Sequence, residues 1–167
     1  MQLYRPVYRL SPEGITLLEK IARFEGEMRA SARDLRSDSG IQAEAAIDAI
    51  HYSTRIEGNA LTREQVTRAL TGKHQGLQRM ERDIKEVLNY SKARHLLLKK
   101  ASHGHGLTLD LALDAHKLLM SGIVRGNLKG HFREAQNVIR DSSTHAIVYL
   151  PPEAKDVPVL MTALCKG

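Results

Sequence analysis

Ser53-Thr-Arg-Ile-Glu-Gly-Asn59 is the most informative stretch of this 167-residue sequence, because it joins a helix end to an unusually placed carboxylate. Ser53 and Glu57 are four residues apart, so on a helix their side chains share one face. Gly58 is a typical helix terminator, which puts Glu57 in the last turn. The helix macrodipole opposes a carboxylate there by about 0.3–1 kcal/mol. The pattern indicates a cationic partner for Glu57, or else a plain helix cap whose charge is balanced by Arg55, Arg63 or solvent.

Helical patterns surround this stretch on both sides. Apolar residues recur at helical spacing and predict helices over 11–33, 41–57, 62–72, 80–100 and 108–120. Three of the predicted starts carry capping residues, namely Ser11 before Pro12, Thr62 with Gln65 three residues later, and Thr108. The composition of 36–40 and of 103–106 predicts breaks between helices.

The pattern changes after Gly122. Val138-Ile139 and the run 146–149 favour strands, and the polar segment 141–144 between them predicts a β-hairpin. Pro151-Pro152 prevents the second strand from continuing and allows a last helix to start, with apolar positions at Val157, Leu160, Met161 and Leu164. The fold class is therefore predicted to be mostly α with one hairpin.

Composition restricts the function classes. The 25 Lys and Arg residues against 19 Asp and Glu give a net charge of +6, which tolerates an anionic partner without requiring one. The single cysteine excludes an internal disulfide and suits a reducing compartment, and neither a signal peptide nor a membrane-spanning run is evident, so we expect a cytoplasmic protein. Seven aromatic residues without tryptophan disfavour a single-strand nucleic-acid binder that works by stacking.

Two groups of motifs, taken in their order along the chain, resemble the Fic/DOC family. Ser53-x-x-x-Glu57-Gly58 resembles the family's inhibitory-helix motif. Downstream, Gly130-His-Phe-Arg133, Gln136-Asn-Val138 and Tyr149-Leu-Pro-Pro152 resemble the region of its "flap" hairpin. The resemblance covers about 45–165 and implies a Fic-type helical bundle, incomplete here, with residues 1–100 as an amino-terminal helical region and 101–167 as the first part of the core.

The resemblance implies a chemistry and roles for several residues. The family transfers AMP from ATP to hydroxyl side chains of proteins. Glu57 would pair with an arginine of the nucleotide site and obstruct the γ-phosphate of ATP, supported by Ser53, in an inhibitory helix at about 41–57 that Gly58 ends. The flap, at about 137–150, would align a target protein by strand-like pairing through residues that include Ile139, Ala146, Ile147, Val148 and Tyr149.

The family's signature, His-Pro-Phe-x-[Asp/Glu]-Gly-Asn-Gly-Arg-x-x-Arg, is absent from the sequence. That signature supplies the general base, the magnesium-binding acid and the arginine that pairs with the inhibitory glutamate. We therefore expect this chain to be the amino-terminal part of a Fic protein and to be inactive alone. ATP and Mg²⁺ would belong to the complete enzyme. The protein substrate is unknown, and the chain could form a homo-oligomer. If absent helices cover a face formed by Ile50, Leu88 and Leu113, that face should be exposed here.

Alternative interpretations remain open. The basic residues along 79–100 fit a non-enzymatic helical module that binds nucleic acid or protein, although interspersed acids favour an ion-paired surface. A remnant that still docks targets through the hairpin is a third class. Single residues receive plainer interpretations: His103 and His105 in a solvated loop rather than on a metal, His116 at the edge of the core, and Cys165 as a buried thiol. His51, two residues before Ser53, is a candidate to face the nucleotide.

Overall fold

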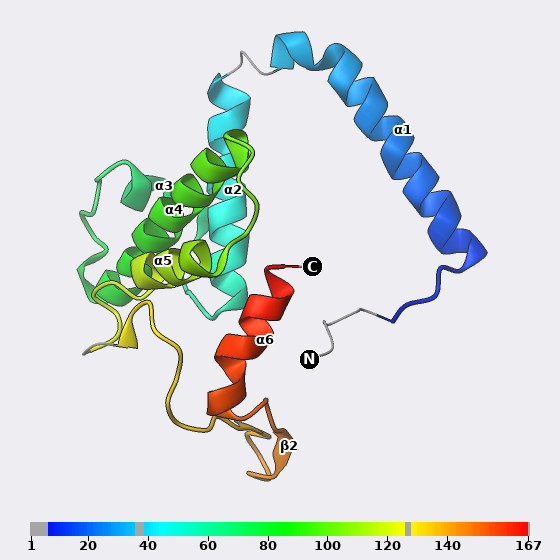
Figure 1. The fold of residues 1–167 in the computed structure, drawn as a ribbon. Helices are drawn as coiled ribbons and strands as arrows, with labels where there is room; N and C mark the ends of the chain where they lie inside the picture. The colour runs from blue at the N-terminus through cyan, green and yellow to red at the C-terminus, as the bar shows by residue number, and fades with distance from the viewer. Residues whose placement is uncertain (1–6, 36–38, 126–127, 167) are drawn as a thin grey trace.

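The computed structural model describes residues 7–35, 39–125 and 128–166, in which six α-helices and one two-stranded antiparallel hairpin form (Figure 1). This confirms the mostly helical prediction. The helices and strands are α1 (Pro12–Leu35), α2 (Ser39–Ile56), α3 (Arg63–Leu70), α4 (Glu81–Ser102), α5 (Leu109–Leu119), β1 (Ile139–Arg140), β2 (Ile147–Tyr149) and α6 (Val157–Leu164). Short 3-10 turns, Gln78–Met80 and Ala154–Asp156, precede α4 and α6.

The capping residues identified in the sequence make the expected bonds. The Ser11 hydroxyl accepts from the amide of Gly14, and the Thr108 hydroxyl accepts from that of Leu111. At α3 both halves of the capping box form between Thr62 and Gln65. The helix boundaries differ from the predicted ones by one or two residues. At α2 the difference falls in a predicted loop, since Ser39 and Gly40 already belong to the helix, and 36–38 lie outside the described residues.

The core lies between α2, α3 and α4. Its buried members are Ile50, Leu61, Val66, Ala69, Leu77, Ile84 and Val87. Leu88 packs against this cluster, and Ile50 is only 3% exposed. The prediction that Ile50, Leu88 and Leu113 form an exposed face is therefore wrong, because α3 and α4 cover α2 within this chain and Leu113 is itself half-buried. The remaining helix of the bundle, α5, packs along α4.

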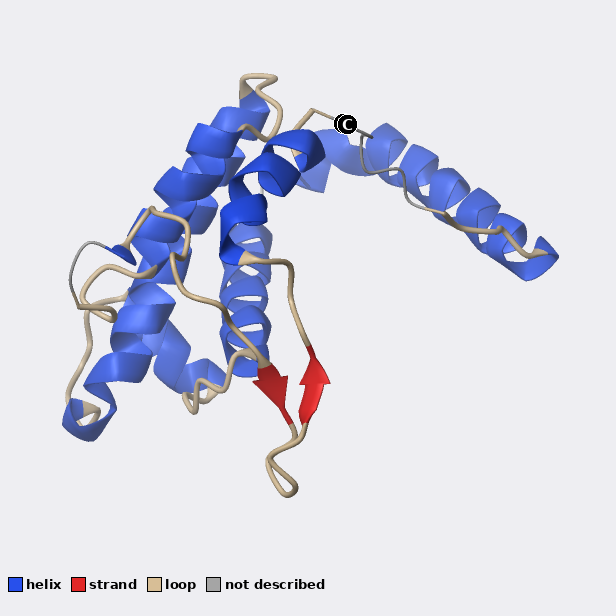
Figure 2. Cartoon of the chain, turned by 60° about the horizontal axis from the view of Figure 1, so that its bottom comes forward, coloured by secondary structure: helices blue, strands red, loops and turns tan. Residues whose placement is uncertain are grey.

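Exposed apolar residues lie elsewhere. Figures 1 and 2 show α1 standing apart from the bundle, and its apolar positions remain open to solvent. The hairpin also lies to one side of the bundle (Figure 2), and both of its strands are exposed. None of the described helices combines the length and the apolar character that a membrane crossing needs. The proposed division at residue 100 stays a prediction.

The hairpin pairs Ile139 with Tyr149 and Arg140 with Ile147, with an irregularity in the register between the two residues of β1. Asp141 organises the turn that joins the strands. One oxygen of its carboxylate accepts bonds from the hydroxyls and amides of both Ser143 and Thr144, at 2.5–3.0 Å. Such Asx-type bonding is the reason that a polar segment can replace a tight two-residue turn here.

These bonds lower the pKa of the Asp141 carboxyl well below its ordinary value of 3.8, the Ser143 hydroxyl contributing most and the Thr144 amide next. Because the folded pKa is lowered, the ionised carboxylate stabilises the turn above about pH 4, and this stability is lost as the pH falls through the lowered pKa. We expect carboxyl ¹³C shifts to show Asp141 still ionised where ordinary aspartates are half-protonated. The variant Ser143→Ala should raise the pKa of the Asp141 carboxyl toward its ordinary value. If Asp141 in the parent chain titrates with the ordinary pKa of an aspartate, the expectation is contradicted.

Candidate functional site

A cleft of about 690 Å³ lies where the end of α2 meets α4 and the segment that follows α5. Ser53 and Glu57, the two polar residues of the motif, both line it. The opposite wall carries Arg82, Glu86 and Tyr90 from α4. Its apolar lining comes from Ile56, Leu119, Met120, Ile123 and Val124. The cleft is thus largely apolar, with a few charged groups at its rim, which is the usual composition of a ligand site.

The local fold of 54–59 places Glu57 at the cleft. The regular part of α2 ends at Ile56, and the amides of Glu57 and Asn59 both return to the carbonyl of Thr54. Gly58 adopts φ +94°, a left-handed conformation that glycine tolerates and side chains oppose. The chain therefore turns sharply directly after Glu57, as the sequence predicted for a helix terminated by glycine.

Glu57 is exposed, and its carboxylate forms no hydrogen bond or ion pair with any described residue. Arg63, one of the neighbours suggested as its partner, instead binds Glu44 and Asp48 on the outer side of α2. These bonds, that to Asp48 first, raise the pKa of the Arg63 guanidinium above its ordinary value. The alternatives in which Arg55 or Arg63 neutralises Glu57 are therefore wrong, and the exposed carboxylate is left to solvent or to a partner from outside the described residues.

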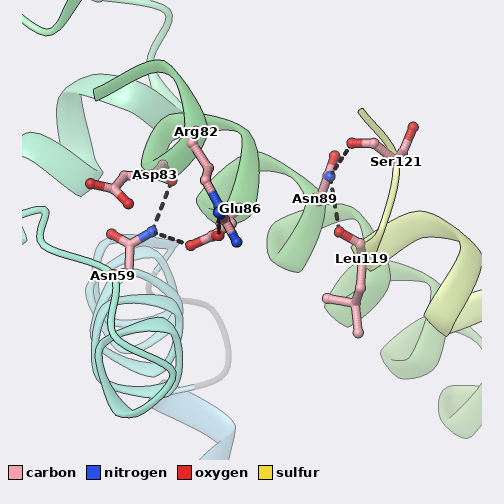
Figure 3. Close-up of polar contacts among 7 residues, drawn as sticks. All are labelled: Asn59, Arg82, Asp83, Glu86, Asn89, Leu119 and Ser121. Carbon is pink, nitrogen blue, oxygen red and sulfur yellow. Dashed lines mark hydrogen bonds and ion pairs between the residues drawn. The ribbon is translucent and has the colours of Figure 1, made fainter. Parts of the chain in front are cut away.

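A chain of polar contacts supports the wall opposite Glu57 (Figure 3). Arg82 Nε donates to Glu86 at 3.1 Å, and the second oxygen of Glu86 accepts from the Asn59 amide at 3.1 Å. The same Asn59 amide nitrogen donates to the Asp83 carbonyl at 3.0 Å, while its oxygen accepts from the Leu61 amide. Asn59 is 5% exposed, so these bonds lie inside the protein. The sequence suggested only a helix cap at this position.

Asn89 is a second buried amide, and the sequence patterns did not single it out. It is 6% exposed and donates to the carbonyls of Leu119 and Ser121, at 3.0 and 2.6 Å (Figure 3). Leu119 is the last residue of α5, where helices leave acceptors unsatisfied, and Ser121 lies two residues beyond it. The signal was present in the sequence, since an amide within the apolar pattern of a long helix must find partners when it is buried.

The hairpin is not part of this cleft, because none of its residues lines it. Ile139, Ala146, Ile147, Val148 and Tyr149 are all exposed, and Ala146 lies just before β2 rather than in it. A smaller cavity of about 470 Å³ lies between α5, the segment before the hairpin and α6. There Gly130 donates its amide to His116 Nδ1 at 3.1 Å, so His116 is half-buried and hydrogen-bonded, as predicted.

The other candidates lie apart from the cleft. His51 is 4% exposed, its Nδ1 has no hydrogen-bond partner, and it does not line the cleft. His103 binds the Lys99 carbonyl at the end of α4, and Cys165 is half-buried rather than buried. On α4 the basic pattern is partly neutralised by the pairs Arg82–Glu86 and Lys85–Glu81. No group of three or more His, Cys, Asp or Glu residues suited to a metal gathers in the described ranges.

Comparisons with known proteins place this geometry in context. No protein-family model matches the sequence, and no curated protein matches it. Among solved structures, the chain is similar to the crystal structure of a Fic family protein from Desulfovibrio desulfuricans G20. The TM-score is 0.75 at 30% sequence identity, and the match covers 98% of this chain and 47% of that one. The chain thus spans about half the length of the solved protein.

Proposed function

We propose that this chain, which belongs to the Fic family by its structure and spans part of a Fic protein, carries the regulatory part of a protein adenylyltransferase. In this proposal Glu57 is the inhibitory carboxylate, Ser53 supports it, and Gly58 ends the helix that presents both. AMP transfer from ATP to a protein hydroxyl is the activity that the rest of the fold would perform. The proposal makes this chain inactive by itself.

The observation that carries the proposal is an unpaired carboxylate at the rim of a cleft. Glu57 makes no hydrogen bond or ion pair among the described residues, although arginines lie near it in sequence. Bonds between a carboxylate and a guanidinium are among the strongest that proteins form, and they are frequently bidentate. A guanidinium from the part of the fold outside this chain would find Glu57 free to bind. The bound carboxylate would then occupy the space that a terminal phosphate needs.

The residues present do not by themselves fit ATP or Mg²⁺. The described part of the chain lacks a cluster of magnesium-ligating side chains, and the sequence lacks a glycine-rich loop that would cradle phosphates. The cleft also presents two carboxylates, Glu57 and Glu86, against one guanidinium, that of Arg82. A polyphosphate would meet net repulsion there. We therefore propose that this chain restricts how the nucleotide binds and that it performs no step of the AMP transfer.

The hairpin is proposed to dock the target protein. Both strands are exposed, and a two-stranded ribbon leaves its outer edges free to pair with an extended peptide. The bonds of Asp141 hold the turn, so the ribbon keeps its shape without burial against the bundle. In this proposal target docking and inhibition use different surfaces of the chain, because none of the hairpin residues lines the cleft.

The test replaces the matched region of the Desulfovibrio desulfuricans protein with this chain and measures transfer of labelled AMP from ATP. Removing the inhibitory carboxylate with Glu57→Ala should raise the rate by about tenfold, which corresponds to about 1.4 kcal/mol of barrier. Glu64→Ala, which removes an exposed carboxylate outside the cleft, is the matched control and should leave the rate unchanged. The isolated chain should transfer no label.

Two results would contradict the proposal at different levels. Equal labelling by the parent chimera and by Glu57→Ala would remove the inhibitory role of Glu57 while leaving the transferase activity. No labelling by either chimera, when circular dichroism shows both to be folded, would remove the adenylyltransferase assignment itself.

A further inference from the structure

One face of α1 repeats apolar residues with the spacing of a coiled coil. Leu17, Ile21, Phe24 and Met28 follow one another at intervals of four, three and four residues. This alternation keeps them on one seam of a helix, at the a and d positions of a heptad. In the structure they are 58, 62, 63 and 47% exposed. Figure 1 shows α1 extending away from the bundle, and the exposed fractions show that the seam is open to solvent.

We propose that this seam binds the same seam of a second copy of the chain, as an antiparallel pair of helices. A twofold pair is self-complementary, because each copy presents the same surface to the other. Four apolar residues from each helix would then leave water together. The inference goes beyond the proposed function and does not depend on it, since none of these residues lines the cleft.

Charges beside the seam favour a second copy as the occupant. With Ile21 and Met28 at a, and Leu17 and Phe24 at d, the two g positions within the span of these four residues hold Lys20 and Glu27. In an antiparallel pair the g position of one helix faces that of the other, so Lys20 meets the partner's Glu27, and this contact occurs twice. Lys20 has no ion-pair partner among the described residues, and Glu27 has only a long, exposed contact of 3.7 Å with Arg23.

The geometry of the arm favours the antiparallel direction. A helix of 24 residues is about 36 Å long, and it joins the bundle only through its carboxyl end. Antiparallel pairing therefore sets the two bundles at opposite ends of the pair, where two chains of charge +6 repel each other little. Parallel pairing would bring the two bundles together at one end.

Sedimentation equilibrium of the whole chain tests the proposal over a roughly hundredfold range of concentration. The parent chain, whose mass is 18.6 kDa, should form a dimer. Ile21→Glu should give a monomer at all concentrations, because it places a charge in the seam. Ala22→Glu adds the same charge one residue away, on the outer side of the same helix, and should leave the dimer intact. Circular dichroism should show equal helix content in both variants.

Charge reversal tests the direction of pairing. Lys20→Glu should weaken the dimer about tenfold, and adding Glu27→Lys should restore it. Glu25 is at an e position, and in a parallel pair it would face Lys20 of the other copy. Restoration by Glu25→Lys instead would therefore indicate a parallel pair and overturn the antiparallel geometry. A parent chain that stays monomeric overturns the proposal and leaves the rest of a Fic fold as the occupant of the seam. A dimer that survives Ile21→Glu overturns it too, since the contact then lies on another surface.

Discussion

Replacing Asn59 by alanine should lower the free energy of unfolding by about 3 kcal/mol, more than any change to an exposed residue of the cleft. Asn59 is 5% exposed, and its side chain makes three hydrogen bonds. One bond goes to a charged partner, Glu86, and such bonds contribute about 1.5–3 kcal/mol, against about 1 kcal/mol for a neutral pair. In a chain of this size the loss should lower the melting temperature by roughly 6–12 °C.

The position of Asn59 explains why a single amide has this effect. It lies directly after the turn that ends α2, and its bonds reach forward to Leu61 and across to the first turn of α4. Without it, the Asp83 carbonyl and one Glu86 oxygen lose this donor, and the Leu61 amide loses its acceptor. Asn59→Asp should be more destabilising than Asn59→Ala at neutral pH, since it places a second carboxylate beside Glu86. This excess should fade as the pH falls and the new carboxyl becomes protonated.

Urea unfolding followed by circular dichroism measures the effect. The control is Glu57→Ala, two residues away, whose exposed side chain makes no hydrogen bond or ion pair among the described residues, so stability should change by less than about 0.5 kcal/mol. Equal stability of Asn59→Ala and Glu57→Ala would contradict a structural role for this amide. It would also mean that Glu86 is held by Arg82 alone.

Asn59 and Thr62 differ in how well their hydrogen bonds could be predicted from the sequence. The capping box of Thr62 is a local signal, because both of its bonds lie within four residues, and it was predicted correctly. Asn59 also follows a helix, but its partners Asp83 and Glu86 are 24 and 27 residues away. No local pattern specifies such a pairing, since it depends on how α2 and α4 pack.

The candidate site shows the same limit. Placing Ser53 and Glu57 together needed only the four-residue spacing and the stop at Gly58, and the structure puts both at one cleft. The opposite wall, which holds Arg82 and Tyr90, could not be derived, because it forms by tertiary packing. Similarly, the apolar spacing of α1 predicted a helix but not its exposure. The apolar face of an amphipathic helix packs against another surface, but the sequence pattern does not specify whether the same chain or another chain supplies that surface.

Replacing Asn89 by leucine should lower the free energy of unfolding by about 2–4 kcal/mol, even though the two side chains have the same number of heavy atoms and the same branching. The Asn89 amide, 6% exposed, donates to the carbonyls of Leu119 and Ser121 and so ties the end of α5 to α4. Leucine would leave both carbonyls without this donor. Urea unfolding provides the measurement, with Lys92→Leu on the exposed side of the same helix as the control for added apolar surface.

Asn89 also contacts the segment that forms one wall of the cleft. Its effect on stability could therefore come from positioning this wall or from stabilising the whole bundle. Leu119 and Met120 line the cleft, and the two carbonyls that Asn89 binds flank Met120. If the Asn89 side chain positions this segment, backbone hydrogen exchange in Asn89→Leu should accelerate first at 119–124. The free energy of opening at these residues should then be lower than the free energy of global unfolding. Uniform acceleration over α2, α3 and α4 would instead mean that Asn89 stabilises the bundle as a whole, and the positioning of the cleft wall would have to come from apolar packing alone.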